Sequence, residues 1–175
     1  MDNRAEILVA AGQHSFTGSV ETRGLRILDV LIDPNSQFLK LHDVAIHRRF
    51  EAKPIRKISE TLFRKTNIDF VLLKAQHHEA PMRRAHAMVA KRRHSALIVL
   101  DHCEIRGAYM SKGMIDPMQV LHEDSPQFFA VVSPNVYQGA DDKMVFANAA
   151  LINKAKVVLF HYEAQTASRS LVGIR

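Results

Sequence analysis

The chain has 175 residues, 47% of them hydrophobic, and a formal net charge of +6. This length allows one domain or two small ones with a buried core. No apolar run approaches the roughly 20 residues that cross a bilayer, and the first residues are charged where a secretory signal would be apolar. The single Cys103 has no partner for an internal disulfide, which fits a reducing compartment. We expect a cytoplasmic protein, either free or peripheral to a membrane complex, without a transmembrane segment.

The chain contains an internal duplication. Residues 6–24 align without a gap with residues 95–113, and the alignment pairs Gly18 with Gly107. After a one-residue insertion the register resumes at Gln37-Phe38 with Gln127-Phe128, and later at residues 70–73 with residues 157–160. A constant spacing over several elements indicates a repeated structural unit.

Each copy begins with a predicted β-hairpin. In the first copy an apolar run at residues 7–11 is followed by a turn at Gly12-Gln13 and by alternating polar and apolar residues. The same pattern occupies residues 97–109 of the second copy. Gly18 and Gly107 fall on the inward-facing side, where glycine allows a sharp bend or a close backbone approach.

A short helix follows each hairpin. In the first copy the apolar residues are spaced by three or four, and Asp33-Pro34 ends the pattern. In the second copy Asp116 is a predicted N-cap and Pro117 suits the first helical position. Helices this short are marginal alone, so we expect them to be stabilised by packing on the hairpin.

The remaining segments of both copies predict further strands. In the first copy they are residues 37–41 with 44–47, 55–63 and 68–73, with a turn at 64–67. In the second copy they are residues 127–132 with 135–137, 144–150 and 156–161, with a turn at 151–154. About five strands and one short helix in each copy suit a bent antiparallel sheet that closes into a small barrel.

The segment FANAALINKAKVVLF at residues 146–160 resembles the closing half of Sm-like barrels, where a short helical turn joins two strands. The resemblance implies a mainly β fold with short helices. We expect two tandem five-stranded Sm-like or SH3-like barrels, at residues 1–78 and 95–175, joined by a basic helix at residues 79–94. The RNA-binding loop residues of Sm-like proteins have no match here, so no binding site is carried over.

A second pattern, R-x-x-D-x-L…F-x-x-L-x-D, resembles uncharacterised bacterial proteins of similar size. It consists of Arg26, Asp29, Leu31, Phe38, Leu41 and Asp43. The resemblance covers most of each copy and implies no particular activity.

The segment between the copies is strongly basic. Its positive residues are Arg83, Arg84, Lys91, Arg92 and Arg93, and Glu79 is its only acid. Residues 80–89 have the composition of an amphipathic helix. Such a helix can dock on an anionic surface, which would be an acidic protein face, lipid headgroups or RNA phosphates. The alternative is a solvated linker helix whose charges serve solubility.

Metal and cofactor motifs are missing from the sequence. His77-His78 is an adjacent pair without helical ligand spacing, and the chain has no H-E-x-x-H or C-x-x-C. Asp101-His102-Cys103 has Gly12-Gln13-His14 as its counterpart, whereas a duplicated metal site would keep its ligands in both copies. We expect no metal and no cofactor.

Catalytic patterns are missing as well. Cys103 and His102 are adjacent in sequence, and adjacent residues on a strand point to opposite faces of the sheet. The carboxylate pairs Asp29 with Asp33 and Asp141 with Asp142 suit helix ends and turns, and there is no glycine-rich phosphate loop. We therefore expect a protein that is not an enzyme.

Two functions remain open. The first is a structural or adaptor subunit that docks on a larger protein assembly, at an anionic or membrane-peripheral surface, with Phe50, Phe128 and Phe129 as apolar contact residues. The second is a nucleic-acid-binding module, suggested by the Sm-like resemblance and the positive charge. The tail at residues 164–175 suits either an extension along a partner or an unstructured end.

Overall fold

The computed structural model describes residues 4–74, 92–111, 116–138 and 143–164. The first copy contains β1 (Arg4–Ala11), β2 (His14–Glu21), α1 (Ile27–Ile32), β3 (Phe38–Arg48), β4 (Arg56–Arg64), the 3-10 turn η1 (Lys65–Asn67) and β5 (Phe70–Leu73). The second contains β6 (Arg92–Leu100), β7 (Cys103–Ser111), α3 (Pro117–Leu121), β8 (Phe128–Gln138), β9 (Lys143–Phe146), β10 (Ala149–Asn153), η3 (Lys154–Lys156) and β11 (Val157–Ala164). The fold is mainly β, as predicted.

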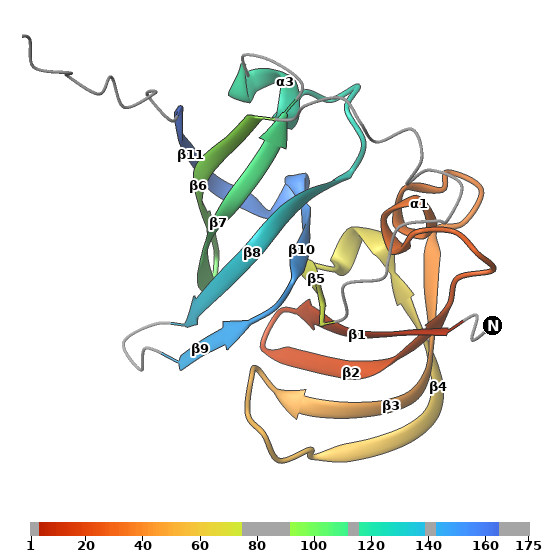
Figure 1. The fold of residues 1–175 in the computed structure, drawn as a ribbon. Helices are drawn as coiled ribbons and strands as arrows, with labels where there is room; N and C mark the ends of the chain where they lie inside the picture. The colour runs from red at the N-terminus through yellow and green to blue at the C-terminus, as the bar shows by residue number, and fades with distance from the viewer. Residues whose placement is uncertain (1–3, 75–91, 112–115, 139–142, 165–175) are drawn as a thin grey trace, which may run out of the picture.

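All described strands belong to one open antiparallel sheet of eleven strands (Figure 1). Its order is β11-β6-β7-β8-β10-β5-β1-β2-β3-β4, and β9 also pairs with β8. Each copy uses the same order, because β5 and β11 pair with the first strand of their copy and β4 and β10 lie beside the third. The duplication seen in the sequence therefore recurs in the strand pairing.

The two inward glycines lie where strands approach closely, as their pattern predicted. A Cβ added at Gly18 would lie 2.8 Å from the His42 carbonyl oxygen, and one at Gly107 would lie 2.5 Å from Val131 Cγ1. The pairing register shifts at each glycine, between β2 and β3 and between β7 and β8. Glycine is thus required sterically at the same bend of both copies.

The predicted C-terminus of the first helix and the predicted N-terminus of the second are confirmed. α1 stops before Asp33, and the Asp116 carboxylate accepts a hydrogen bond from the Met118 N–H while Pro117 occupies the first turn of α3. Ile27 and Leu31 of α1 are buried in the core of the first copy. Packing on the sheet therefore stabilises a helix of only six residues.

A lysine that the sequence analysis did not single out closes each helix. Lys65 Nζ donates to the carbonyls of Val30 at 2.7 Å and Asp33 at 3.2 Å. Its counterpart Lys154 donates to the carbonyls at the end of α3, including that of Glu123 at 3.0 Å. A cation suits the negative end of a helix, and these carbonyls have no helical partner. Burial lowers the pKa of Lys65, and Asp33 opposes this shift.

The end of the second copy differs from its prediction. The turn was expected at residues 151–154, but Leu151 to Asn153 belong to β10. The turn is η3, at Lys154–Lys156. The strand expected at residues 144–150 is divided into β9 and β10. The Asn-Lys sequence does mark the turn, because the Asn153 side chain accepts a hydrogen bond from the Ala155 N–H at 3.1 Å, but the buried residues before it belong to β10.

The register predicted for the last strand of each copy is wrong by two residues. The sequence alignment placed Phe70 opposite Val157, whereas Phe70 corresponds to Leu159 in the structure. Val71 pairs with Val9 on β1, and Phe160 pairs with Ile98 on β6. Ile98 is the counterpart of Val9, so Phe160 is the counterpart of Val71 and Leu159 that of Phe70. Apolar residues on both sides of these strands made the alignment ambiguous.

The two copies meet at the pairing of β5 with β10. Val71 lies opposite Leu151 and Phe70 lies opposite Ile152. The Asn153 N–H donates to the Asp69 carbonyl at 3.0 Å. All four residues of β5 are buried. Such strands are nearly continuous in hydrophobic sequence because both of their faces are covered.

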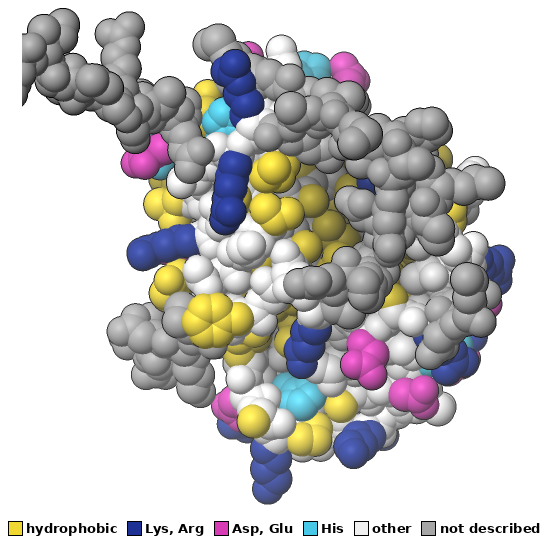
Figure 2. Space-filling view, viewed as in Figure 1, with side chains coloured by type: hydrophobic (Ala, Val, Ile, Leu, Met, Phe, Trp, Pro, Cys, Tyr) yellow, Lys and Arg dark blue, Asp and Glu magenta, His cyan; other side chains and the backbone are white. Residues whose placement is uncertain are grey.

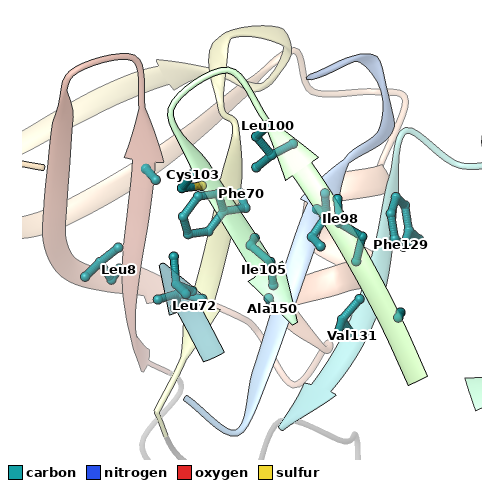
Figure 3. Close-up of a cluster of buried hydrophobic side chains, with 14 residues drawn as sticks. Leu8, Phe70, Leu72, Ile98, Leu100, Cys103, Ile105, Phe129, Val131 and Ala150 are labelled. Atoms are coloured by element: carbon teal, nitrogen blue, oxygen red, sulfur yellow. The ribbon is translucent and has the colours of Figure 1, made fainter. Parts of the chain in front are cut away.

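Each face of this junction belongs to a different core. One core contains residues of β6, β7 and β8 together with Leu8, Phe70 and Leu72 from the first copy (Figure 3). The other contains residues of β1, β3 and α1 together with Phe128 and Leu151 from the second copy. Each copy therefore supplies side chains that complete the core of the other.

A buried ion pair lies beside the junction. Arg49 Nη1 is 3.3 Å from Asp69 Oδ2, and both residues are buried. Asp69 also accepts a hydrogen bond from the Gly12 N–H at 3.0 Å, and Arg49 donates to the Gly12 carbonyl. The guanidinium lies 5.6 Å from the centre of the Phe70 ring. These contacts join the β1–β2 turn, the end of β3 and the start of β5.

Removing one member of this pair should destabilise the protein strongly. We expect Arg49→Met to lower the free energy of unfolding by about 3–5 kcal/mol, because it leaves the Asp69 carboxylate buried without a cation. The double variant Arg49→Met/Asp69→Asn should lose less, since no buried charge remains. Urea unfolding measures both values.

The control is Lys40→Met, which breaks the exposed pair of Lys40 with Glu60 and should change the free energy of unfolding little, because solvent screens this pair. A single Arg49→Met variant no less stable than this control would contradict the role given to the buried pair.

Candidate interaction surface

The described side chains bear on the predictions for metal binding and for nucleophilic chemistry. Within these residues no group of three His, Cys, Asp or Glu side chains could hold a metal ion. Neither helix in the described part of the chain is long and apolar enough to cross a membrane.

Cys103 is buried between the two copies. Its sulfur lies 3.6 Å from Arg49 Nη2, and Figure 3 shows it beside Phe70. Burial raises the pKa of the Cys103 thiol to about 11, although the Arg49 charge opposes this shift. His102 instead lies in the exposed β6–β7 turn, near Gln13 Nε2. The pair therefore lacks the geometry and the ionisation that a nucleophile needs.

The carboxylates of the first helix have local structural partners. Arg26 donates to Asp29 through Nε at 2.9 Å and through a terminal nitrogen at 2.7 Å. Asp33 accepts a hydrogen bond from the Asn35 N–H at 2.9 Å. The Arg-x-x-Asp part of the second resemblance thus joins the start of α1 to its first turn. The pair Asp141 with Asp142 lies outside the described residues.

Two shallow hollows lie on the first copy. One, of about 300 Å³, is lined by Glu6, Thr17, Gly18, Asp43 and Lys74 among others. The second, of about 310 Å³, lies between β2, α1 and β3 and has both basic and acidic walls. Neither gathers several groups of one charge or chemistry, so neither indicates a class of ligand.

Only part of the predicted basic segment can be located. Arg92 and Arg93 are exposed, but they begin β6 instead of ending a connector helix. Arg83, Arg84 and Lys91 lie outside the described residues, as does most of the predicted connector at residues 79–94. On the face shown in Figure 2, described Lys and Arg side chains are separated by other residues and form no continuous patch.

The three aromatic contact residues are not free surface residues, which corrects their predicted exposure. Phe128 and Phe129 are buried on β8, where they point into opposite cores. Phe50 is partly buried, and its ring lies 6.1 Å from that of Phe70. Strand alternation places Phe128 and Phe129 on opposite faces of β8, and the junction of the copies buries both.

Five of the eight large apolar residues that are exposed in the described part lie at the two ends of the sheet, and Leu25, Met118 and Phe146 lie elsewhere. Phe38, Ile55 and Leu62 lie on or beside β4, while Val158 and Leu159 lie on β11. Among the described strands β4 pairs only with β3, and β11 pairs only with β6. The two edges lie on opposite sides of the view in Figure 1. Unpaired edges with apolar side chains are templates for contact with another chain.

The sequence contains only a partial signal for these edges. The apolar residues of the strands were assigned to internal cores, and the strand order could not be deduced from local patterns. Comparison of the copies would have shown that Leu62 and Leu151 are equivalent, but it does not tell which of them is covered.

The thiol of Cys103 should be unreactive in the folded protein. We expect alkylation by iodoacetamide at pH 8 to be slower by at least a hundredfold than in urea-unfolded protein, because the thiol is buried and its pKa is raised. Because the pKa of the thiol is raised from 9.0 to about 11 in the folded protein, the free energy of unfolding should be highest below pH 9 and should fall as the pH rises toward 11.

A variant carrying Lys53→Cys supplies an exposed control thiol in a loop. It should react rapidly while Cys103 stays unmodified. Equal rates for the two thiols would contradict the burial of Cys103.

No known family model, curated protein or solved structure matches this chain.

Proposed function

We propose that the protein is a non-catalytic structural or adaptor subunit that docks on a larger protein assembly through the free edges of its sheet. The observation that carries the proposal is the pair of edge strands, β4 and β11, with their exposed apolar residues. Monomeric proteins usually cover or charge such edges, and β4 carries charged residues such as Arg56 and Lys57 beside its apolar ones. Here Leu62 is 62% exposed at one edge and Leu159 is 46% exposed at the other.

The distribution of polar residues supports the same function. Arg49 with Asp69, Arg26 with Asp29 and the two helix-closing lysines all hold parts of the fold together. Within the described residues, no group of three His, Cys, Asp or Glu side chains could hold a metal ion. A scaffold role accounts for these contacts without a further site.

In this proposal each copy is a small barrel of the Sm-like or SH3-like kind. The support is the repeated strand order and the 3-10 turn before the last strand of each copy. Arg92 and Arg93, with Arg83, Arg84 and Lys91, would add contacts to an anionic part of the assembly, such as an acidic protein face or lipid headgroups. The alternative of RNA binding rests on the charge and the resemblance alone.

The test compares edge variants at native abundance in cell extract. We expect the wild-type chain to sediment in a particle well above its own 19.8 kDa. Leu62→Lys and Leu159→Lys should each move it toward the size of the free chain, because a lysine at the centre of an apolar contact must be desolvated.

The control is Leu25→Lys, which changes an exposed leucine that lies on neither edge and should leave the particle intact. A wild-type chain that is always free and monomeric in the extract would refute the proposed function.

A further inference from the structure

The internal junction shows how the two edges of this fold can join. At that junction β5, the last strand of the first copy, pairs with β10 of the second copy. The strand equivalent to β10 in the first copy is β4, and the strand equivalent to β5 in the second copy is β11. These equivalents are the two strands that end the sheet. Each end of the sheet is therefore a strand equivalent to one of the two junction strands, with no partner on its outer side among the described strands.

The strands of the internal junction and their counterparts at the free edges differ in the exposure of equivalent residues. Residues that cross the internal junction are buried, and their counterparts at the free edges are exposed. The pairs are Phe128 at 2% with Phe38 at 43%, Leu151 at 3% with Leu62 at 62%, and Phe70 at 0% with Leu159 at 46%. The same structural positions are therefore apolar in both copies but covered only once.

At the free edges, the apolar residues also lie on the side of the sheet that the internal junction requires. Leu151 reaches from the second copy into the core of the first copy, beside Val71. Leu62 is its counterpart, and the counterpart of Val71 is Phe160, which packs on the core of the second copy. If the free edges joined in the same register, Leu62 would enter the second core of another molecule beside Phe160.

The reverse contact follows from the same register. Phe70 reaches from the first copy into the core of the second, where it lies opposite Ile152. Their counterparts are Leu159 and Phe63, and Phe63 packs against the core of the first copy. Leu159 would therefore cover the first core of the neighbouring molecule. Each free edge supplies the side chain that the other edge can bury.

We propose that β4 of one molecule pairs antiparallel with β11 of a second copy of this chain, in the register of the β5–β10 junction. The paired residues are Glu60 with Tyr162, Thr61 with His161, Leu62 with Phe160 and Phe63 with Leu159. Each molecule has one edge of each kind, so the contact is head to tail and every added molecule presents a new edge. Such a contact closes into a ring or continues as a filament, according to the rotation between neighbours.

This inference rests on the proposed function, because it names the chain itself as the partner at the two edges. The apolar area left exposed at the edges supports this choice, since a matching surface already exists in every molecule. An unrelated partner would have to reproduce the strand register and the apolar pattern of β5 or β10.

The hydrogen-bonding pattern identifies a pair suited to a disulfide test. The Asn153 N–H donates to the carbonyl of Asp69, directly opposite, so pairs alternate from there and Ala150 with Leu72 is a non-hydrogen-bonded pair. Its counterpart at the free edges is Thr61 with His161. Cα atoms of such pairs lie about 4.5 Å apart, within the range that a disulfide bridges.

The experiment mixes two full-length variants, Thr61→Cys and His161→Cys, under mild oxidation with glutathione. We expect a disulfide dimer that contains one chain of each variant, with little dimer of either variant alone. A chain that carries both substitutions should give a series of larger oligomers. Buried Cys103 stays in place and should not react.

A register control replaces His161→Cys with Glu163→Cys, two residues further along β11. The diagonal distance of about 7–8 Å is too long for a disulfide, so the yield should fall at least tenfold. Equal yields for the two positions, or a dominant Thr61→Cys dimer with itself, would overturn the proposed contact.

Sedimentation of the purified protein completes the test. Leu62→Lys should weaken self-association by about tenfold or more, because it removes the burial of one leucine, while Leu25→Lys should have no effect. A purified wild-type chain that stays monomeric and forms no mixed disulfide would overturn self-association. If Leu62→Lys still released the chain from its particle in cell extract, the proposed function would stand with a different partner.

Discussion

The pairing of β5 with β10 is the contact on which the rest of the structure depends. It is only four residue pairs long, yet both of its faces are buried and each face belongs to a different core. Phe70 and Leu72 complete the core of the second copy, while Leu151 and Phe128 complete that of the first. Neither half of the chain can bury its apolar residues without the other. The duplication has therefore produced one continuous sheet in which the copies are interdependent.

Polar contacts secure this arrangement at points where apolar packing cannot. The Arg49–Asp69 pair links the turn of the first hairpin to the start of β5, and it lies against Phe70 at the junction. Lys65 and Lys154 close helices that are too short to be stable alone. The counterpart of Asp69 is Val158, which is exposed on β11. The internal junction therefore has a charged contact at a position where the free edge has an apolar residue.

Local patterns predicted the hairpins, the helix ends and the glycine bends because neighbouring residues determine those features. The Asp116 cap, the stop at Asp33 and the close approach at Gly107 are examples. The division of β9 from β10 and the junction of the copies could not be predicted, since they depend on which distant strands are adjacent. The same reason explains the error for Phe128 and Phe129, which an alternating pattern places on a strand but not in a particular core. The candidate surface was the least predictable part, because exposed Leu62 and buried Leu151 occupy equivalent positions in sequence.

Native-state hydrogen exchange tests the central claim, that the two copies form one cooperative sheet through β5 and β10. The backbone amides of Val71 and Leu151 should belong to the slowest class and exchange only through global unfolding, with the same dependence on urea. The amides of the strands on either side, β1 and β8, should reach the same limit. Exchange of Leu151 at lower free energy than Val71, or unfolding of the two copies in separate steps, would contradict this account.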